Sequence, residues 1–207
     1  MNLRWGILGC ARISRRGLIP GIQASKTGRL VALASRNPAT ARAWCDEFKI
    51  LESHETHQGL LEDPEIDAVY IPLPNELHKP WVVAAAEDGK HVLCEKPLAL
   101  NAVEAREMVE QCRSCGVLLM EAFMWRHQPR TLNSARVAAG LLGELRLIRS
   151  SFSFHIEPGD WRLDPAREGG SLWDVSDVTE SARRGSSRAL SPSRSGLGRD
   201  SVQPASV

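Results

Sequence analysis

The stretch HVLCEKPLAL, residues 91–100, places charged residues directly after a short apolar run. Residues 91–94 are typical of a buried strand, and Glu95, Lys96 and Pro97 end that strand abruptly. A surface turn would explain this pattern. An active site at the carboxyl edge of a parallel sheet would explain it equally well, and the neighbouring segments decide between the two.

Apolar segments alternate with helical segments through the first 123 residues. Apolar strands that alternate with helices indicate a parallel sheet covered on both faces, and ligands bind such sheets at the carboxyl ends of the strands. We therefore expect an α/β fold with a doubly wound parallel sheet, a Rossmann domain over residues 1–122, with Lys96 at its functional edge. Strands are expected at residues 3–8, 30–35, 67–71, 91–94 and 117–123, and helices at 13–24, 38–48, 78–88 and 101–115.

The pattern changes after residue 123. Residues 128–139 predict a helix, and residues 145–154 alternate as a half-buried antiparallel strand does. We expect residues 123–175 to begin an α+β substrate and dimerisation domain. Residues 176–207 lack Trp, Tyr, Phe, Ile and Met and are rich in Ser, Arg, Gly and Pro, so we expect a disordered tail.

The turn after the first strand resembles a dinucleotide-binding fingerprint. Small residues in such a turn let the backbone approach a pyrophosphate at the start of a helix. Two of the three glycine positions are substituted, and a merely tight strand–helix turn is the alternative. The residues expected to bind the cofactor here are Gly9, Cys10, Ala11, Arg12 and Ile13.

The second strand ends without an acidic residue. An NAD site would place Asp or Glu near this point to bind the ribose 2′-hydroxyl, whereas Ser35 and Arg36 suit a 2′-phosphate. We therefore expect NADP rather than NAD as the cofactor. The alternative is that Arg36 is a solvated loop arginine.

The third clear strand leads into a rigid, proline-containing loop. Leu73, Pro74, Asn75 and His78 are expected to line the cofactor site from this loop. Asn75 either binds the cofactor or caps the next helix, and His78 either joins the site or only helps to start that helix.

Composition excludes several classes of function. The net charge of +1 indicates neither a nucleic-acid nor a membrane partner, and no apolar run approaches the length of a transmembrane helix. The N-terminus lacks the pattern of a signal peptide, and five irregularly spaced cysteines suit a reducing compartment, so we expect a cytoplasmic protein. Cys112 and Cys115 form a lone pair, which predicts no metal site.

Three segments together resemble the Gfo/Idh/MocA oxidoreductase family. They are GILGCARIS (residues 6–14), LVALASRN (residues 30–37) and YIPLPNELHKPWVVAAAEDGKHVLCEKPLALN (residues 70–101). MEAFMWRHQP, residues 120–129, resembles the branch that holds NADP-dependent, xylose-type sugar dehydrogenases and dimeric dihydrodiol dehydrogenases. The resemblance extends from about Arg4 to Val175.

The resemblance implies roles for individual residues. Lys96 matches the lysine beside the nicotinamide and the substrate hydroxyl, and Glu95 would hold Lys96 or its loop in place. The peptide before Pro97 is often cis in this family. Arg126 and His127 match the segment that enters the substrate cavity.

The resemblance stops within a glycine-rich motif. Residues 169–175 match it, and Asp174, its aspartate, is counted with Lys96 and Glu95 among the catalytic residues. Val178 stands where the motif has the His or Tyr that serves as general acid–base. A frameshift or truncation of the gene would explain the change, and a selected disordered linker is the alternative. A continuation of the motif in another reading frame past codon 175 would support the frameshift.

The resemblance implies hydride transfer between NADP and a sugar, at C1 of an aldose, or a related secondary alcohol. We expect turnover to be impaired in this chain. The alternatives are a catalytically inactive NADP-binding protein or sensor, a trans-dihydrodiol as substrate, and a chain that does not fold stably. The family's homodimer is doubtful because most of the second domain's sheet is not matched.

Overall fold

The structure is a computed structural model that describes residues 2–140, 147, 149, 151, 153–167, 169 and 170. The chain divides into two compact units. The first combines residues 1–124 with residues 152–177, and the second combines residues 125–151 with residues 178–207.

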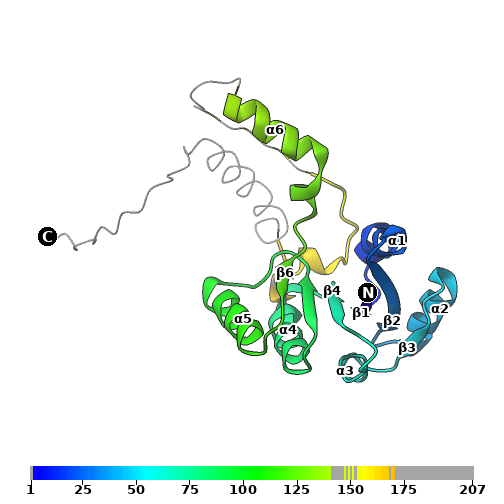
Figure 1. Ribbon diagram of the computed structural model, residues 1–207. Helices are drawn as coiled ribbons and strands as arrows, with labels where there is room; N and C mark the ends of the chain where they lie inside the picture. The colour runs from blue at the N-terminus through cyan, green and yellow to red at the C-terminus, as the bar shows by residue number, and fades with distance from the viewer. Residues whose placement is uncertain are drawn as a thin grey trace, which may run out of the picture. The chain divides into compact units, whose positions relative to one another are not determined.

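The first unit contains a six-stranded sheet in which every pair of neighbouring strands is parallel (Figure 1). The strand order is β3-β2-β1-β4-β5-β6, so the chain moves outward from β1 first in one direction and then in the other. The carboxyl edge beside β1 and β4 is therefore the topological switch point, where such sheets bind ligands. The strands are β1 (Leu3–Leu8), β2 (Gly28–Ala34), β3 (Glu52–His54), β4 (Ala68–Ile71), β5 (His91–Cys94) and β6 (Leu119–Glu121).

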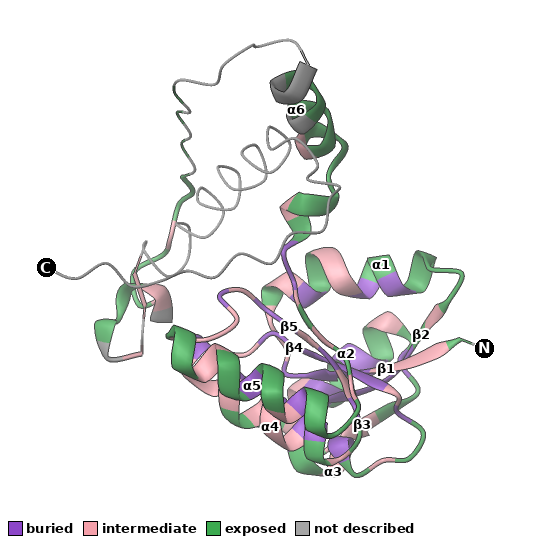
Figure 2. Ribbon diagram, turned by 60° about the vertical axis from the view of Figure 1, so that its left-hand side comes forward, coloured by how far each residue is buried: buried purple, intermediate pink, exposed green. Residues whose placement is uncertain are grey.

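Helices cover both faces of the sheet (Figure 2). Buried side chains of α1 and α2 pack on one face, and those of α3, α4 and α5 pack on the other. This arrangement confirms the expected doubly wound Rossmann fold. The helical segments are η1 (Ser14–Leu18), α1 (Ile19–Ala24), α2 (Pro38–Phe48), α3 (His57–Leu61), η2 (Asn75–Leu77), α4 (His78–Glu87) and α5 (Ala102–Ser114).

Asparagine side chains fix the starts of the two longest helices on the sheet. The Oδ1 atom of Asn37 accepts hydrogen bonds from the amides of Ala39 and Thr40, at 3.0 and 3.2 Å. The Oδ1 atom of Asn101 accepts in the same way from two amides of α5, each at 3.0 Å. These bonds satisfy amides that have no partner within the helix, which explains why α2 and α5 begin where the sequence predicts.

Some elements differ from the sequence-based expectation. The helix expected over residues 13–24 begins with a π-helical segment, η1, before α1. The strand β3 and the helix α3 were not expected, because a three-residue strand (ESH) and a five-residue helix are too short to show a period. The final strand covers Leu119–Glu121 rather than residues 117–123.

In the second unit, α6 (Pro129–Gly140) confirms the helix predicted over residues 128–139, and η3 (Met124–His127) precedes it. The strand predicted over residues 145–154 falls partly outside the described residues. Where the structure does describe it, at residues 147, 149, 151, 153 and 154, the backbone is not in a strand. The tail expected over residues 176–207 lies wholly outside the described residues.

Two short turns, η4 (Trp161–Leu163) and η5 (Pro165–Arg167), belong to the first unit.

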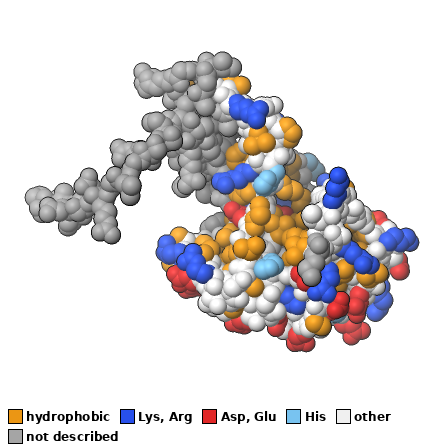
Figure 3. All heavy atoms as spheres, in the orientation of Figure 1, with side chains coloured by type: hydrophobic (Ala, Val, Ile, Leu, Met, Phe, Trp, Pro, Cys, Tyr) orange, Lys and Arg blue, Asp and Glu red, His pale blue; other side chains and the backbone are white. Residues whose placement is uncertain are grey.

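Acidic and basic side chains are interspersed on the face shown in Figure 3, in keeping with a net charge of +1. Among the described residues, no helix combines the length and the apolar character needed to cross a bilayer.

Candidate functional site

Four loops at the carboxyl edge of the sheet carry most of the residues predicted to form a site. Residues 9–13 follow β1, residues 35 and 36 follow β2, residues 73–78 follow β4, and residues 95 and 96 follow β5. Since all four strands are parallel, their carboxyl ends meet at one edge. The fold therefore gathers residues from separate stretches of sequence around the switch point.

Gly9 lets the loops after β1 and β4 approach each other closely. Its φ angle is +107°, a conformation that favours glycine, and its amide donates to the carbonyl oxygen of Ala34 at 2.7 Å. A Cβ atom at Gly9 would lie 3.0 Å from Cδ2 of Leu73. The turn after β1 is thus tight, as a dinucleotide phosphate site requires.

The end of β2 combines a hydroxyl, a guanidinium and a helix N-terminus. Arg36 is exposed, and the Oγ atom of Ser35 accepts from the amide of Asn37 at 3.2 Å. Burial raises the pKa of the Cys10 thiol, and a hydrogen bond with Ser35 opposes that rise. Cys10 therefore joins the turn after β1 to the end of β2 and is protonated at neutral pH.

Arg12 forms an ion pair that the sequence did not predict. Its Nη2 atom lies 3.0 Å from Oδ2 of Asp160, a residue 148 positions later in the chain. The Arg12 side chain is 72% exposed, whereas Asp160 is nearly buried and also accepts from the Arg162 amide at 3.1 Å. The segment around Asp160 therefore contacts the turn that is expected to bind phosphate.

His78 joins the loop after β4 to the loop after β5. The ring is fully buried, with Nδ1 2.8 Å from the carbonyl oxygen of Pro97 and Nε2 2.8 Å from that of Leu73. Burial lowers the pKa of His78, although both carbonyls and the carboxylates of Glu95 and Glu76 oppose this. Sequence left open whether His78 merely starts α4. It is the first residue of α4, but its ring bridges two loops.

Asn75 does not cap α4, which was one of its two proposed roles. It is buried and begins the short 3-10 helix η2, and Leu77 stands at the N-cap of α4 without a side-chain cap. Pro74 precedes η2 and Leu73 contacts the Gly9 turn.

The loop that carries Lys96 is anchored to three different elements. Glu95 is buried, and its Oε1 accepts from the hydroxyl of Tyr70 on β4 at 2.5 Å, while its Oε2 accepts from the Lys96 amide at 3.2 Å. The carbonyl of Pro97 contacts His78 of α4, and the amide of Leu98 donates at 2.9 Å to Glu121 of β6. Lys96 is partly buried, and the Lys96–Pro97 peptide is cis, as the resemblance implied.

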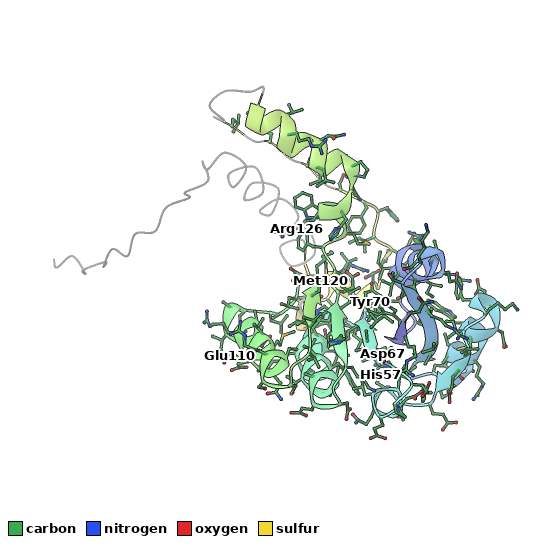
Figure 4. The ribbon with its side chains drawn as sticks, viewed as in Figure 1. His57, Asp67, Tyr70, Glu110, Met120 and Arg126 are labelled. Atoms are coloured by element: carbon green, nitrogen blue, oxygen red, sulfur yellow. The ribbon has the colours of Figure 1, made fainter. Side chains whose placement is uncertain are left out.

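Tyr70 is a second participant that sequence reasoning missed. It lies within the entirely buried strand β4, where the sequence predicted a strand and no role for its hydroxyl (Figure 4). Burial, followed by the charge of Glu95 and their hydrogen bond, raises the pKa of Tyr70 well above its ordinary value. Only the pairing of β4 with β5, which places Ile71 beside Cys94, brings the phenol to Glu95.

Three of the residues predicted to form the site do not belong to the described part of the first unit. Arg126 and His127 lie in η3 and belong to the second unit, and Asp174 lies outside the described residues. Their proposed roles remain predictions.

One group of potential metal ligands occurs among the described residues, away from Lys96. Glu52, His54 and Asp63 place their ligand atoms within 4.8 Å of one another. His54 Nε2 lies 3.2 Å from Asp63, and the Nζ atom of Lys90 donates to the Asp63 carbonyl at 2.7 Å. The contact between His54 and Asp63 accounts for this group without a metal, and we assign it none.

The family model for an oxidoreductase family with an NAD-binding Rossmann fold, Gfo/Idh/MocA, matches residues 3–123. The D-xylose 1-dehydrogenase (NADP(+)) 2 of Haloferax volcanii is 46% identical over 184 residues, which cover 88% of this chain and 56% of that protein. The trans-1,2-dihydrobenzene-1,2-diol dehydrogenase of Mus musculus is 35% identical over 179 residues, which cover 84% and 53%.

Among solved structures, KijD10, a 3-ketoreductase from Actinomadura kijaniata in complex with NADP and TDP-benzene, superposes with a TM-score of 0.80. It is 37% identical, and the match covers 84% of this chain and 54% of that one. The chain thus spans about half the length of the relatives that it matches. Because the family model matches residues 3–123 and the relatives share this level of identity, the chain belongs to the Gfo/Idh/MocA oxidoreductase family.

Proposed function

We propose that this chain is the dinucleotide-binding part of an NADP-dependent oxidoreductase that transfers hydride between the nicotinamide and a sugar or related secondary alcohol. The observation that carries the proposal is the meeting of the Gly9 turn, the Ser35–Arg36 end of β2 and the Lys96 loop at one sheet edge. These are the parts that a dinucleotide needs at its pyrophosphate, its ribose and its reactive ring.

NADP is favoured over NAD by the groups at the end of β2. A 2′-phosphate gains charge-assisted hydrogen bonds from a guanidinium, and the N-terminus of α2 adds a favourable dipole. A carboxylate, which would bind a free 2′-hydroxyl, is absent from residues 34–37. The names of the haloarchaeal dehydrogenase and of the KijD10 complex both mention NADP, which agrees with this choice.

Bound NADP would supply the hydride acceptor or donor, and the residues of this chain would position it and the substrate. The turn after β1 would hold the pyrophosphate, and Arg36 with Ser35 would hold the 2′-phosphate. Lys96 would donate a hydrogen bond to the reacting oxygen and stabilise negative charge on it as its proton leaves. Glu95 would fix the Lys96 backbone through its contact with the Lys96 amide.

We expect this chain to lack the residue that accepts the proton of the substrate. The family motif ends in a His or Tyr, and this chain has Val178 there. A valine takes up no proton, so Lys96 would have to act without its usual partner. We therefore propose cofactor binding with weak turnover, at C1 of an aldose or on a trans-dihydrodiol.

Calorimetric titration of the 207-residue chain with NADP+ and NAD+ tests the cofactor. We expect tighter binding of NADP+, and a loss of about tenfold to a hundredfold in NADP+ affinity for Arg36→Ala, since a hydrogen bond to a charged group contributes roughly 1.5–3 kcal/mol. NAD+ affinity should change little. Arg42→Ala, which removes an exposed arginine farther along α2, is the matched control. Equal effects of both variants would refute the phosphate site.

Turnover is tested separately by absorbance at the reduced nicotinamide band. D-xylose, other aldoses and trans-dihydrobenzenediol are offered with NADP+, and Lys96→Ala serves as the control for background reduction. Reduction that depends on Lys96 supports an oxidoreductase and identifies the substrate class. Cofactor binding without any Lys96-dependent reduction would favour the inactive NADP-binding protein instead.

A further inference from the structure

The proposed function does not explain why the buried ring of His78 contacts two loops at the sheet edge. A fully buried histidine could simply fill space at the start of α4. Instead, each of its two ring nitrogens lies 2.8 Å from a backbone carbonyl oxygen, and the two carbonyls belong to different loops. A neutral ring donates to only one of these oxygens, whereas an imidazolium donates to both, so hydrogen bonds to both loops at once belong to the protonated ring.

The two linked loops are the ones that carry Asn75 and Lys96. The Leu73 carbonyl lies in the segment between β4 and η2, and the Pro97 carbonyl directly follows Lys96. Tyr70 and Glu121 hold the same loop at Glu95 and Leu98. The contact with His78 acts on Pro97, the residue immediately after Lys96.

The position of His78 makes this link rigid. The side chain starts at the first turn of α4, which packs into the buried cluster through Val82, Ala85 and Ala86. A short side chain on a packed helix has little freedom to follow a moving loop. The ring therefore transmits the fixed position of α4 to both loops.

We propose that His78 is a positioning residue, which clamps the Lys96–Pro97 turn to the loop after β4 and so fixes Lys96 at the nicotinamide end of the cofactor site. This role rests on the proposed function. The clamp acts on only one half of the dinucleotide, because Arg36 and the N-terminus of α2 lie at the end of a different strand, β2.

The asymmetry gives a test that separates positioning from general stability. NADPH spans both halves of the site, whereas 2′,5′-ADP carries only the adenosine half with its 2′-phosphate. His78→Asn keeps a donor near the position of Nδ1, and His78→Gln keeps one near Nε2, so each retains one side of the clamp. His78→Phe retains neither. Val82→Ala is the matched control, since it removes buried atoms from the same helix and removes no hydrogen bond to either loop.

We expect His78→Asn and His78→Gln to weaken NADPH binding about threefold to tenfold and His78→Phe to weaken it further, as one and then both hydrogen bonds of the protonated ring are lost. Affinity for 2′,5′-ADP should stay within about twofold of the original chain, since its site involves no contact of His78. Val82→Ala should leave both affinities unchanged. Unaltered NADPH affinity, or equal loss of both ligands, in the His78 variants would overturn the clamp.

A measurement without ligand tests the clamp independently of the proposed cofactor. Amide hydrogen exchange of residues 95–99 should accelerate in His78→Phe and not in Val82→Ala. If the original chain binds neither ligand, the proposed function fails, and this exchange measurement still decides whether the clamp exists. If exchange is the same in both variants, the clamp is refuted even where NADPH binds.

Discussion

The phenol of Tyr70 on β4 donates a 2.5 Å hydrogen bond to the carboxylate of Glu95, the residue before Lys96 at the end of β5. Tyr70 is 2% exposed and Glu95 is 9% exposed, so this bond is made in the interior. The same carboxylate accepts from the Lys96 amide. A core residue of one strand therefore helps to set the backbone of the proposed catalytic loop on the next.

Tyr70→Phe should destabilise the chain. The substitution keeps the ring and removes one hydrogen bond to a buried carboxylate, which corresponds to about 1–3 kcal/mol. Urea unfolding followed by circular dichroism measures the change in the free energy of unfolding. Phe48→Leu, a change in the partly buried shell of the same cluster, controls for altered aromatic packing. Unchanged stability of Tyr70→Phe would show that Glu95 does not depend on the phenol.

Tyr70 should stay protonated in the folded chain at a pH where tyrosine ordinarily ionises. It is the single tyrosine of the sequence, so absorbance near 295 nm reports its ionisation alone. Its pKa is raised by burial and by Glu95, whereas the unfolded chain ionises near pH 10. The folded state thus binds more protons above pH 10, and stability should fall as pH rises beyond it. A tyrosinate signal near pH 10 in protein that is still folded would contradict this.

Asp67 and Arg4 should stabilise the amino ends of β4 and β1 in a pH-dependent way. Asp67 accepts from the Arg4 amide at 2.8 Å and from its guanidinium at 2.7 and 3.0 Å. The hydrogen bonds from Arg4 lower the pKa of Asp67 to about 2, below its ordinary value. The contribution is therefore present above pH 4 and lost as the pH falls towards 2.

Asp67→Asn tests this contribution. The variant should be less stable than the original chain at pH 7, and the difference should shrink steadily below pH 4 in urea unfolding. Glu55→Gln, at an exposed carboxylate, provides the same charge change and should show no such trend. A stability difference that is constant from pH 7 to pH 3 would rule out the ionised pair as its source.

Asp160→Asn should raise the affinity of the chain for NADP+. In the structure Asp160 holds the Arg12 guanidinium and places a negative charge beside the turn expected to bind pyrophosphate. Removing that charge frees Arg12 for phosphate and removes a repulsion, which should tighten binding by roughly threefold to tenfold. Calorimetry at low and high salt measures the effect, which salt should reduce. Glu157→Gln in the same segment is the control, and weaker binding by Asp160→Asn would mean that this contact supports the site.

Residues with strong local preferences were predictable. Examples are the helix that begins at Pro38, the helix that follows Asn101, the glycine of the turn after β1 and the apolar strands predicted over residues 91–94 and 67–71. Those preferences depend only on residues close together in the chain, so they can be recognised as sequence patterns. The short elements β3 and α3 were missed because pairing with β2 stabilises β3, and burial of Leu60 and Leu61 in the core stabilises α3.

By itself, the sequence determined the α/β class. It also predicted a site at the carboxyl edge of the sheet, with Ser35, Arg36 and Lys96 as its polar groups. Tertiary structure alone decided that Tyr70 meets Glu95, that His78 joins two loops and that Asp160 reaches Arg12. The physical reason is separation along the chain. Contacts over 25 and 148 residues depend on strand order and register, and no local preference of the residues involved encodes them.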